Sequence, residues 1–344
     1  MRIALDVMGG DHGCVVAIRG AKRALDTDNR ITALMLVGQE EKIRAALREA
    51  GLVDPRVQIV HASEVLTMKD KPLEGIRKKK DSSLVRAIEL VRSKKADAVI
   101  SAGNTGALVA GSMKLGRVEG VERPAIACRF PSFSQDFIML DCGANTVAEP
   151  SHLAQFAVMG RIYAREILGV EKPRVGVLSN GTEEGKGTEL TQAAARFCAR
   201  LNLDFIGYCE GFDLFNDGVD VVVCDGFTGN IVLKTCESLS KTFSRLLKNE
   251  VKANPVRVVG GALARGAFSA LKRRLDPEVY GGAAVLGVNG IVIKAHGSSR
   301  ERAFASAVRV ATDEFGRGLK QMIAADIQQA NQQIAALTAG ATGT

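Results

Sequence analysis

Tryptophan is absent from the sequence, and tyrosine occurs only three times among 344 residues. Few aromatic side chains are therefore available to stack on nucleic-acid bases, and no nucleic-acid-binding motif is present. No apolar run approaches the roughly 20 residues of a membrane-spanning helix. Four histidines lie far apart in the chain, at His12, His61, His152 and His296. These absences argue against a nucleic-acid-binding protein, a membrane span and a site with several histidine ligands.

Closely spaced cysteine pairs are also missing. The seven cysteines never form a Cys-x-x-Cys pair, so neither a zinc site nor a disulfide framework is indicated. Asp6 interrupts the first apolar run before a signal-peptide core could form. We therefore expect a cytoplasmic protein with reduced thiols, most of them small core residues.

The sequence does not match the common motifs of nucleotide-binding proteins and hydrolases. Residues 181–188 resemble a Walker A loop, but only three residues separate Gly181 from Gly185, and Gly187 stands where Ser or Thr should bind magnesium. The dinucleotide fingerprint, the nucleophile elbow of serine hydrolases and the zinc-protease motif do not occur. We expect no cofactor and no metal, and the missing fingerprint argues against a dehydrogenase.

The composition is that of a globular protein, with 46% hydrophobic and 24% charged residues. The net charge of +8 suits an acidic protein, an anionic membrane or nucleic acid, and composition alone does not choose among them.

Short apolar runs alternate with longer amphipathic stretches. The expected strands are 3–7, 34–37, 57–61, 98–101, 126–129, 137–141, 175–179, 204–207, 220–224 and 290–294. The expected helices are 15–25, 40–50, 84–93, 153–167, 189–200, 231–249 and 301–333. This alternation predicts an α/β protein with a mostly parallel sheet between two helical layers. We expect one unit over residues 1–337 and a frayed tail over 338–344.

Glycine-rich polar loops follow six of the expected strands, at residues 8–13, 101–107, 141–146, 179–188, 224–230 and 294–299. Ligands of open α/β sheets bind beyond the carboxyl ends of the strands, and helix N-termini direct N–H groups at anions. Any one such loop is also an ordinary turn. Six loops expected on one edge favour a site for an anionic or carbonyl-bearing substrate.

The order of these motifs resembles the PlsX family, the phosphate acyltransferases of bacterial phospholipid synthesis. The resemblance covers about residues 1–320 and rests on these segments: LDVMGGDHG, KPLEGIRKKKDSSL, SAGNTGA, LDCGAN, SNGTEEGKG, DGFTGN and YGGAAVLGVNGIVIKAHGSS. It implies a fold like that of isopropylmalate dehydrogenase and a homodimer. It also implies that phosphate attacks the thioester of acyl–acyl carrier protein and yields acyl phosphate, which a glycerol-3-phosphate acyltransferase consumes.

The chemistry suits the residues, since phosphate needs no strong base and the protein must mainly stabilise an oxyanion. We predict Lys186 and Asn230 as the central pair, with an N-cap as the alternative role of Asn230. Further candidates for substrate or phosphate binding are Gly9, Gly10, Asp11, His12, Asn104, Thr105, Gly106, Asn145, Asn180, Glu183, Glu184, Gly185, Gly187, Asp225, Thr228, Gly229 and His296.

One other mechanism and two other functions stay open. Cys142 as a covalent acyl carrier has no neighbouring base to activate it. A short-chain phosphate acetyl- or butyryltransferase using coenzyme A would share chemistry and fold. A scaffold at a membrane surface would leave the polar loops without a purpose.

Residues 251–275 form a basic amphipathic segment, with Pro255 at a helix start after Asn254 as its cap. We expect one apolar stripe at helical spacing to touch an anionic membrane, through Val256, Val259, Leu263, Phe268 and Leu271. Packing in a core or dimer interface is the alternative. A second basic cluster, residues 77–80, is either a solvated turn or a docking surface for the acidic carrier protein.

Overall fold

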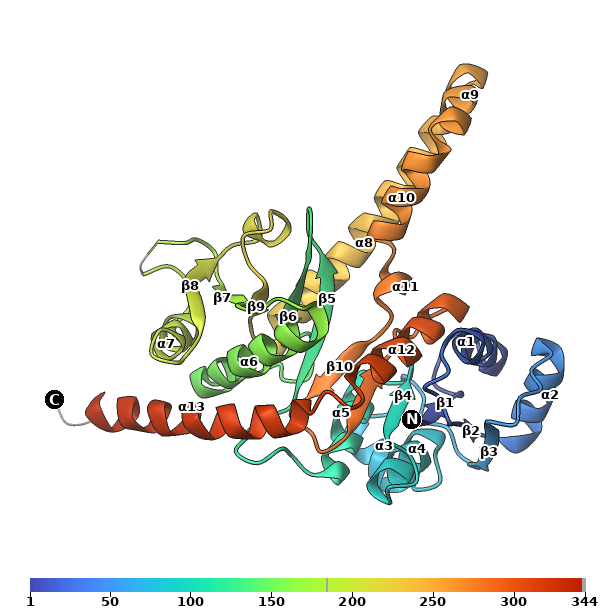
Figure 1. The fold of residues 1–344 in the computed structure, drawn as a ribbon, viewed down its shortest axis with the longest axis horizontal. Coiled ribbons are helices and arrows are strands. Elements are labelled where there is room, and N and C mark those ends of the chain that lie inside the picture. The colour runs from blue at the N-terminus through green and yellow to red at the C-terminus, as the bar shows by residue number, and fades with distance from the viewer. Residues whose placement is uncertain (184, 342–344) are drawn as a thin grey trace.

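The computed structural model describes residues 1–183 and 185–341, which fold around one sheet (Figure 1). Five strands form its first half: β1 (Arg2–Asp6), β2 (Ala33–Gly38), β3 (Val57–His61), β4 (Ala98–Ser101) and β11 (Ile291–Lys294). The others are β5 (Ala125–Pro131), β6 (Asp136–Leu140), β7 (Arg174–Leu178), β8 (Asp204–Cys209), β9 (Val221–Val223) and β10 (Ala283–Leu286). Their order is β3-β2-β1-β4-β11-β10-β5-β6-β9-β7-β8. The predicted α/β fold with a mostly parallel sheet is confirmed, and β10 is the strand that we did not expect.

Two antiparallel strands divide the sheet into halves that run in opposite directions. β1 to β4 and β11 are parallel to one another, as are β6 to β9. Between these groups, β10 is antiparallel to both neighbours and β5 is antiparallel to β6. The tight turn over residues 132–135 is too short for a parallel crossover, which needs a dozen or more residues.

The expectation that six glycine-rich loops share one edge of the sheet is therefore wrong. The loops after β1, β4 and β11 leave one edge, whereas those after β6, β7 and β9 leave the opposite edge. The cause is the β5–β6 hairpin, which reverses the chain direction. Loops that leave opposite edges can share a site only if a further element spans the face of the sheet between them.

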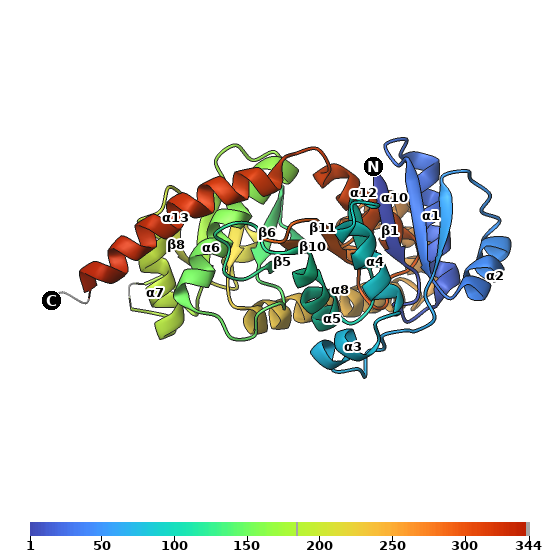
Figure 2. The ribbon, with the colours of Figure 1, turned by 90° about the horizontal axis from the view of Figure 1, so that it is seen from below.

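Helices cover both faces of the sheet (Figures 1 and 2). The first face carries α1 (Cys14–Thr27), α2 (Glu40–Ala50), α6 (Pro150–Tyr163), α7 (Glu189–Cys198), α12 (Glu301–Glu314) and α13 (Leu319–Ala341). The second face carries α3 (Pro72–Lys78), α4 (Ser83–Arg92), α5 (Thr105–Ser112) and the beginning of α8 (Gly226–Val251). Alternate residues of a strand pack into the two cores, with Ile3 and Leu5 on the first face and Ala4 on the second.

The C-terminal helical region differs from the single helix expected over 301–333. It forms α12 and α13, separated at residues 315–318. Gly316 and Gly318 have φ angles of 82° and 69°, which a helix cannot continue through. α13 runs to Ala341, into the segment 338–344 that we expected to fray, and residues 342–344 lie outside the described ones.

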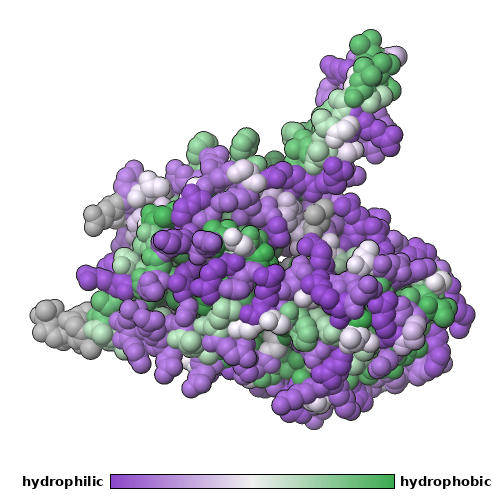
Figure 3. Space-filling model, viewed as in Figure 1, coloured by the Kyte–Doolittle hydropathy of each residue, from purple (hydrophilic) through white to green (hydrophobic). Residues whose placement is uncertain are grey.

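A helical arm (residues 238–275) projects from the body and contains the rest of α8, α9 (Pro255–Leu263) and α10 (Arg265–Leu275) (Figure 1). The predicted start is confirmed, since the Asn254 side chain accepts a 2.9 Å hydrogen bond from the Arg257 N–H. The expected single stripe is interrupted at Ala264, which separates α9 from α10. Neither helix has a buried residue, and apolar side chains gather at the tip (Figure 3). In the described part of the chain, no helix is long and apolar enough to cross a bilayer.

A buried carboxyl group, that of Glu314, lies between α6 and α12. The Tyr163 hydroxyl donates a 2.9 Å hydrogen bond to Glu314 Oε1. Burial nevertheless raises the pKa of Glu314 to about 8, from an ordinary value of 4.5. At neutral pH this carboxyl group is therefore mostly protonated in the folded protein and ionised in the unfolded chain.

Glu314→Gln should remove a pH dependence of stability. The folded protein holds a proton that the unfolded chain releases between pH 4.5 and 8, so wild-type stability falls as the pH rises through this interval. Between pH 5 and pH 8, the Tm of wild type measured by calorimetry should fall by several degrees relative to the Tm of the variant. Equal pH dependence in both proteins would mean that Glu314 ionises normally.

Candidate functional site

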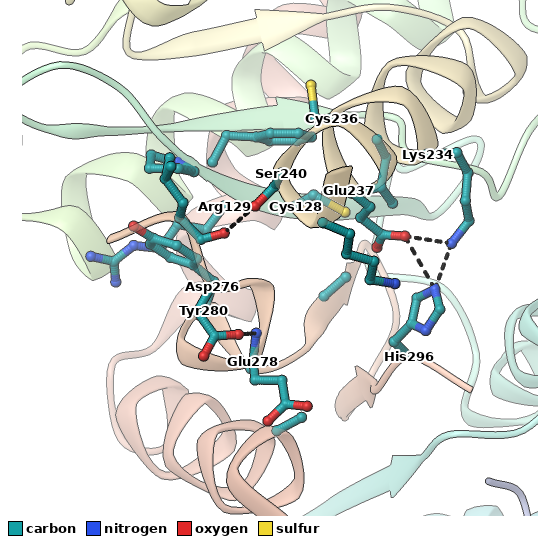
Figure 4. A pocket seen from close by; sticks show the side chains of 18 of the residues that line it. Cys128, Arg129, Lys234, Cys236, Glu237, Ser240, Asp276, Glu278, Tyr280 and His296 are labelled. Atoms are coloured by element: carbon teal, nitrogen blue, oxygen red, sulfur yellow. Dashed lines mark hydrogen bonds and ion pairs between the residues drawn. The ribbon is translucent and has the colours of Figure 1, made fainter. Parts of the chain in front are cut away.

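A large cavity of about 1200 Å³ lies against the second face of the sheet, in the described part of the chain (Figure 4). Ordinary small-ligand pockets measure about 300–1,000 Å³, so this one is larger than a compact ligand fills. Its walls come from β5, one face of α8, α10 and α11 (Pro277–Tyr280). Thr105 follows β4, Gly143 follows β6, and His296 follows β11. Loops from both edges of the sheet therefore line this cavity together with α8.

One end of the cavity holds Lys234, Glu237 and His296, which point toward one another (Figure 4). Lys234 Nζ lies 3.0 Å from Glu237 Oε2 and 2.6 Å from His296 Nε2. The same ring nitrogen lies 3.3 Å from the carboxylate. Burial raises the pKa of Glu237, but the hydrogen bonds from His296 and Lys234 outweigh it and lower this pKa to about 2. Glu237 therefore stays ionised and holds the other two groups in place.

Lys294, the last residue of β11, lines the same end. Burial and the ammonium group of Lys234 lower the pKa of Lys294 to about 8, although Asp11, Asp6 and Glu237 act in the opposite direction. Its ammonium group donates to the carbonyl oxygen of Ala295. This lysine gives up a proton more easily than an ordinary surface lysine does.

Two serines follow on the same loop. Ser298 Oγ lies 2.8 Å from His296 Nδ1, and the Ser298 N–H donates to that nitrogen at 3.1 Å. Ser299 is only 3% exposed, and its hydroxyl has no hydrogen-bond partner in the described residues. An unpartnered buried polar group costs about 1–3 kcal/mol, so a ligand that pairs with it gains affinity. Two ammonium groups and this hydroxyl make the polar end suited to an anion.

Away from this cluster the cavity wall is mixed, with Arg129, Ser240 and Asp276 beside apolar side chains (Figure 4). Its lining includes Leu239 and Phe243 from α8, Leu271 and Leu275 from α10, and Phe130 from β5. Leu239 and Phe243 are 67% and 47% exposed, so their side chains offer open apolar surface. The stretch of α8 that lines the cavity, from Asn230 to Ser244, is about 21 Å long at 1.5 Å per residue. This row of apolar side chains suits an extended apolar group.

Asn230 lies in the second turn of α8 and lines the cavity, one turn before Lys234. The expected alternative, that Asn230 caps the helix, is wrong because α8 begins earlier. Asp225 is the cap, and its carboxylate accepts hydrogen bonds from the Phe227 and Thr228 N–H groups at 3.0 and 2.9 Å. The Thr228 hydroxyl also donates to Asp225, at 2.7 Å. Asp225 and Thr228 thus hold the start of α8, and Asn230 is left to face a ligand.

The loop after β6 is organised by the buried carboxylate of Asp141. It accepts hydrogen bonds from the backbone N–H groups of Gly143, Ala144 and Asn145 at 2.6–3.1 Å. The Asn145 side chain donates to Asp141 and to the Pro124 carbonyl. A Cβ on Gly229 would lie 2.0 Å from the Asp141 carbonyl oxygen. Gly229, predicted to bind substrate, therefore packs α8 against this loop, and Asn145, predicted likewise, ties the loop to Pro124.

The loops after β1 and β4 pack closely against each other. A Cβ on Gly9 would lie 2.6 Å from the Gly103 nitrogen, and one on Gly106 would lie 2.7 Å from Pro72, the first residue of α3. Asn104 caps α5 by accepting a hydrogen bond from the Ala107 N–H at 3.0 Å. Among the residues predicted from these two loops, Thr105 lines the cavity, whereas Gly9, Gly10, Asp11, His12, Asn104 and Gly106 do not.

The loop over 179–188 lies apart from the cavity lining. Asn180 Oδ1 accepts a 2.8 Å hydrogen bond from the Gly187 N–H, so it holds its own loop. Lys186 and Glu183 are exposed and do not line the cavity, and neither do Gly185 and Gly187. Glu184 lies outside the described residues. The catalytic role of Lys186 stays a prediction, and it requires this loop to approach the cavity.

Cys142 lines the cavity but is a poor nucleophile. Its thiol is buried and donates to the Met139 carbonyl oxygen at 3.4 Å. Burial raises its pKa well above the ordinary value, and the neighbouring Cys128 adds to the shift. A thiol held in this form supports no covalent acyl intermediate.

The basic cluster at 77–80 is partly neutralised. Lys78 pairs with Glu74 at 3.2 Å, and Lys79 pairs with Asp70 at 2.7 Å. A docking role would therefore fall mainly on Arg77 and Lys80.

Sequence reasoning missed Lys234, Glu237, Lys294 and Ser299. Signals for them were present, because positions 234 and 237 follow Asn230 at spacings of four and seven on one helix face. Lys294 and Ser299 lie within the loop 294–299 that we singled out for His296.

A family model described as "Fatty acid synthesis protein" matches residues 1–322. A protein of Akkermansia muciniphila named phosphate acyltransferase is 47% identical over 332 residues, covering 94% of this chain and 95% of its own length. A phosphate acyltransferase of Geotalea daltonii is 43% identical over 348 residues and covers 100% of both chains.

The solved structure of a phosphotransacetylase from Streptococcus pyogenes is similar in fold. Its TM-score is 0.62, its sequence identity is 16%, and the match covers 94% of each chain.

Proposed function

Since this chain belongs to the PlsX family of fatty acid synthesis proteins and is an acyltransferase, we propose that it transfers a long-chain acyl group from acyl carrier protein to inorganic phosphate. Its relatives are named phosphate acyltransferases, so phosphate and an acyl donor are its substrates. Beyond these names, we propose that the donor is acyl carrier protein, that the acyl chain is long, and that the product is used in phospholipid synthesis.

The observation that carries the proposal is the cavity, which combines a cluster of charged groups at one end with a row of apolar side chains along α8 and α10. An acetyl or butyryl group would leave Leu239, Phe243 and Leu271 without contacts. Each methylene group that an acyl chain buries there contributes about 0.8 kcal/mol. A long acyl chain therefore uses the whole length of the cavity, with its thioester at the polar end.

Each end has a defined task in the reaction. Lys234 and Ser299 offer N–H and O–H donors to phosphate, and His296 holds Lys234 in place. The Asn230 side chain, one helical turn away, is available to donate to the thioester carbonyl oxygen. As phosphate attacks, that oxygen becomes negatively charged, and a preplaced donor stabilises the charge without rearrangement.

Purified protein incubated with palmitoyl–acyl carrier protein and phosphate tests this function. We expect phosphate-dependent release of carrier thiol and an acyl phosphate that hydroxylamine traps. Matched reactions with acetyl– and butyryl–coenzyme A should be slower by orders of magnitude in kcat/KM. Efficient turnover of the short donors would replace the proposal by short-chain transfer, the alternative that the phosphotransacetylase fold favours. No product with any donor would refute it.

We further propose a homodimer in the cytoplasm that touches an anionic membrane through the tip of the helical arm. Val256, Val259 and Leu263 at this tip are 81%, 61% and 85% exposed. Arg257 and Arg265 lie beside them, and each basic residue near an anionic surface adds about 1 kcal/mol. Acyl phosphate would then form close to the membrane, where a glycerol-3-phosphate acyltransferase consumes it.

Leu263→Glu should reduce flotation with liposomes that contain anionic lipid, because it places a charge in the apolar tip. Val53, which is 99% exposed on the body of the protein, offers the control substitution Val53→Glu. We expect flotation to fall at least severalfold for Leu263→Glu and to be unchanged for Val53→Glu, with wild-type Tm in both. Equal flotation of all three proteins would rule out the tip as the contact.

A further inference from the structure

The proposed function leaves one charged group at the polar end without a task, the lysine that ends β11. Phosphate is assigned to Lys234 and Ser299, and the carbonyl oxygen to Asn230. We propose that Lys294 is the general acid that protonates the departing sulfur of the acyl donor. This inference rests on the proposed function and adds a catalytic residue to it.

The reaction needs such an acid for a chemical reason. The tetrahedral intermediate carries both phosphate oxygen and sulfur, and phosphate is the weaker base of the two. Without help, the intermediate therefore returns to thioester and free phosphate. A proton on sulfur reverses this preference, because an alkyl thiol with a pKa near 8.5 then leaves as the neutral thiol.

The protons and electrons balance within one turnover. A phosphate oxygen forms a bond to the carbonyl carbon, and the C–S bond then breaks with its electron pair on sulfur. Sulfur takes a proton from the Lys294 ammonium group, which becomes an amine. Hydrogen phosphate becomes a stronger acid when it is acylated, so its remaining proton passes to that amine. The products are acyl phosphate and thiol, and the lysine is again protonated.

The surroundings of Lys294 fit this task. Lys234 and Glu237 face it from α8, Asp11 from the loop after β1, and Asp6 from β1. Burial and the Lys234 ammonium group keep its pKa at about 8, close to that of the thiol that leaves. Proton transfer between groups of similar pKa near the working pH is efficient. Its ammonium group has three N–H donors, and the carbonyl of Ala295 takes one.

Other titratable groups at this end are less suitable. Both ring nitrogens of His296 have partners, Nε2 with Lys234 and Glu237 and Nδ1 with Ser298. Glu237 is ionised and accepts rather than donates. Burial raises the pKa of the Cys236 thiol above its ordinary value, so this thiol is a weaker acid than the thiol that leaves.

Lys294→Met tests the inference through the leaving group. With palmitoyl–acyl carrier protein, we expect kcat to fall by about a hundred- to ten-thousandfold. With the palmitoyl thioester of 4-nitrobenzenethiol, whose thiolate leaves without a proton, the loss should be less than tenfold. Lys95→Met, an exposed lysine just before β4, removes the same charge and should behave as wild type with both donors.

A pH profile gives a second and independent measurement. The wild-type kcat/KM should fall above about pH 8 as Lys294 loses its proton, and in Lys294→Arg this descending limb should disappear below pH 10. Equal losses with both donors, or a descending limb that persists in the variants, would overturn the assignment. If wild type forms no acyl phosphate from either donor, the proposed function itself fails, which is a different result.

Discussion

Asn230→Ala is expected to lower kcat by roughly a hundred- to thousandfold, the usual effect of losing one oxyanion donor. Asn230 lines the cavity from α8, and Asp225 already caps that helix, so the asparagine has no duty at the helix start. Its loss should therefore affect the transition state far more than the fold. Steady-state kinetics with palmitoyl–acyl carrier protein measures the change, and KM for phosphate should stay within a fewfold of the wild-type value.

The matched control is Asn29→Ala, since Asn29 is exposed in the turn between α1 and β2. It should keep wild-type kcat. Both variants should melt within a degree or two of wild type. A loss below tenfold in Asn230→Ala, or a loss explained by a lower Tm, would remove Asn230 from the reaction.

Gly229→Ala should destabilise the protein, although alanine usually favours a helix. A Cβ at this position would lie 2.0 Å from the Asp141 carbonyl oxygen and 2.9 Å from Cys224 Sγ. Either α8 or the loop after β6 must move, and overpacking of this kind costs about 3 kcal/mol at the upper end of its usual range. Urea denaturation should show that loss. Activity should also fall, because Asn230 follows directly on the displaced turn.

Gly266→Ala provides the contrasting case within α10. Apart from its chain neighbours and the backbone of its own helix, no atom lies within 4 Å of the Cβ position at Gly266, so alanine should stabilise the helix by about 0.5–1 kcal/mol. If both glycine variants shifted the denaturation midpoint alike, the close approach of α8 to Asp141 would be wrong.

Local sequence patterns were sufficient for most of the fold. The strands formed where short β-branched runs predicted them, because a strand that is buried on both faces consists almost entirely of apolar residues. β10 escaped notice because its four residues, Ala283–Leu286, resemble any short apolar stretch. The reversal of direction was predictable in principle, since the turn over 132–135 is too short for a crossover.

The site was harder to predict, because its members meet through the path of α8. Asn230 and His296 were identified, and the structure brings both to the cavity. Lys234 and Glu237 carry no local motif and become significant only because their helix crosses the loop that holds His296. Several predicted glycines have packing roles instead, as close contacts at Gly9 and Gly229 indicate. For Lys186, the predicted role awaits the same kinetic assay.

The most direct measurement is a crystal structure of the protein with inorganic phosphate and an unreactive palmitoyl thioether of pantetheine. We predict phosphate within hydrogen-bond distance of Lys234 and Ser299, the sulfur beside Lys294, and the alkyl chain along Leu239 and Phe243. Phosphate and chain bound elsewhere, with this cavity unfilled, would contradict the assignment of the active site.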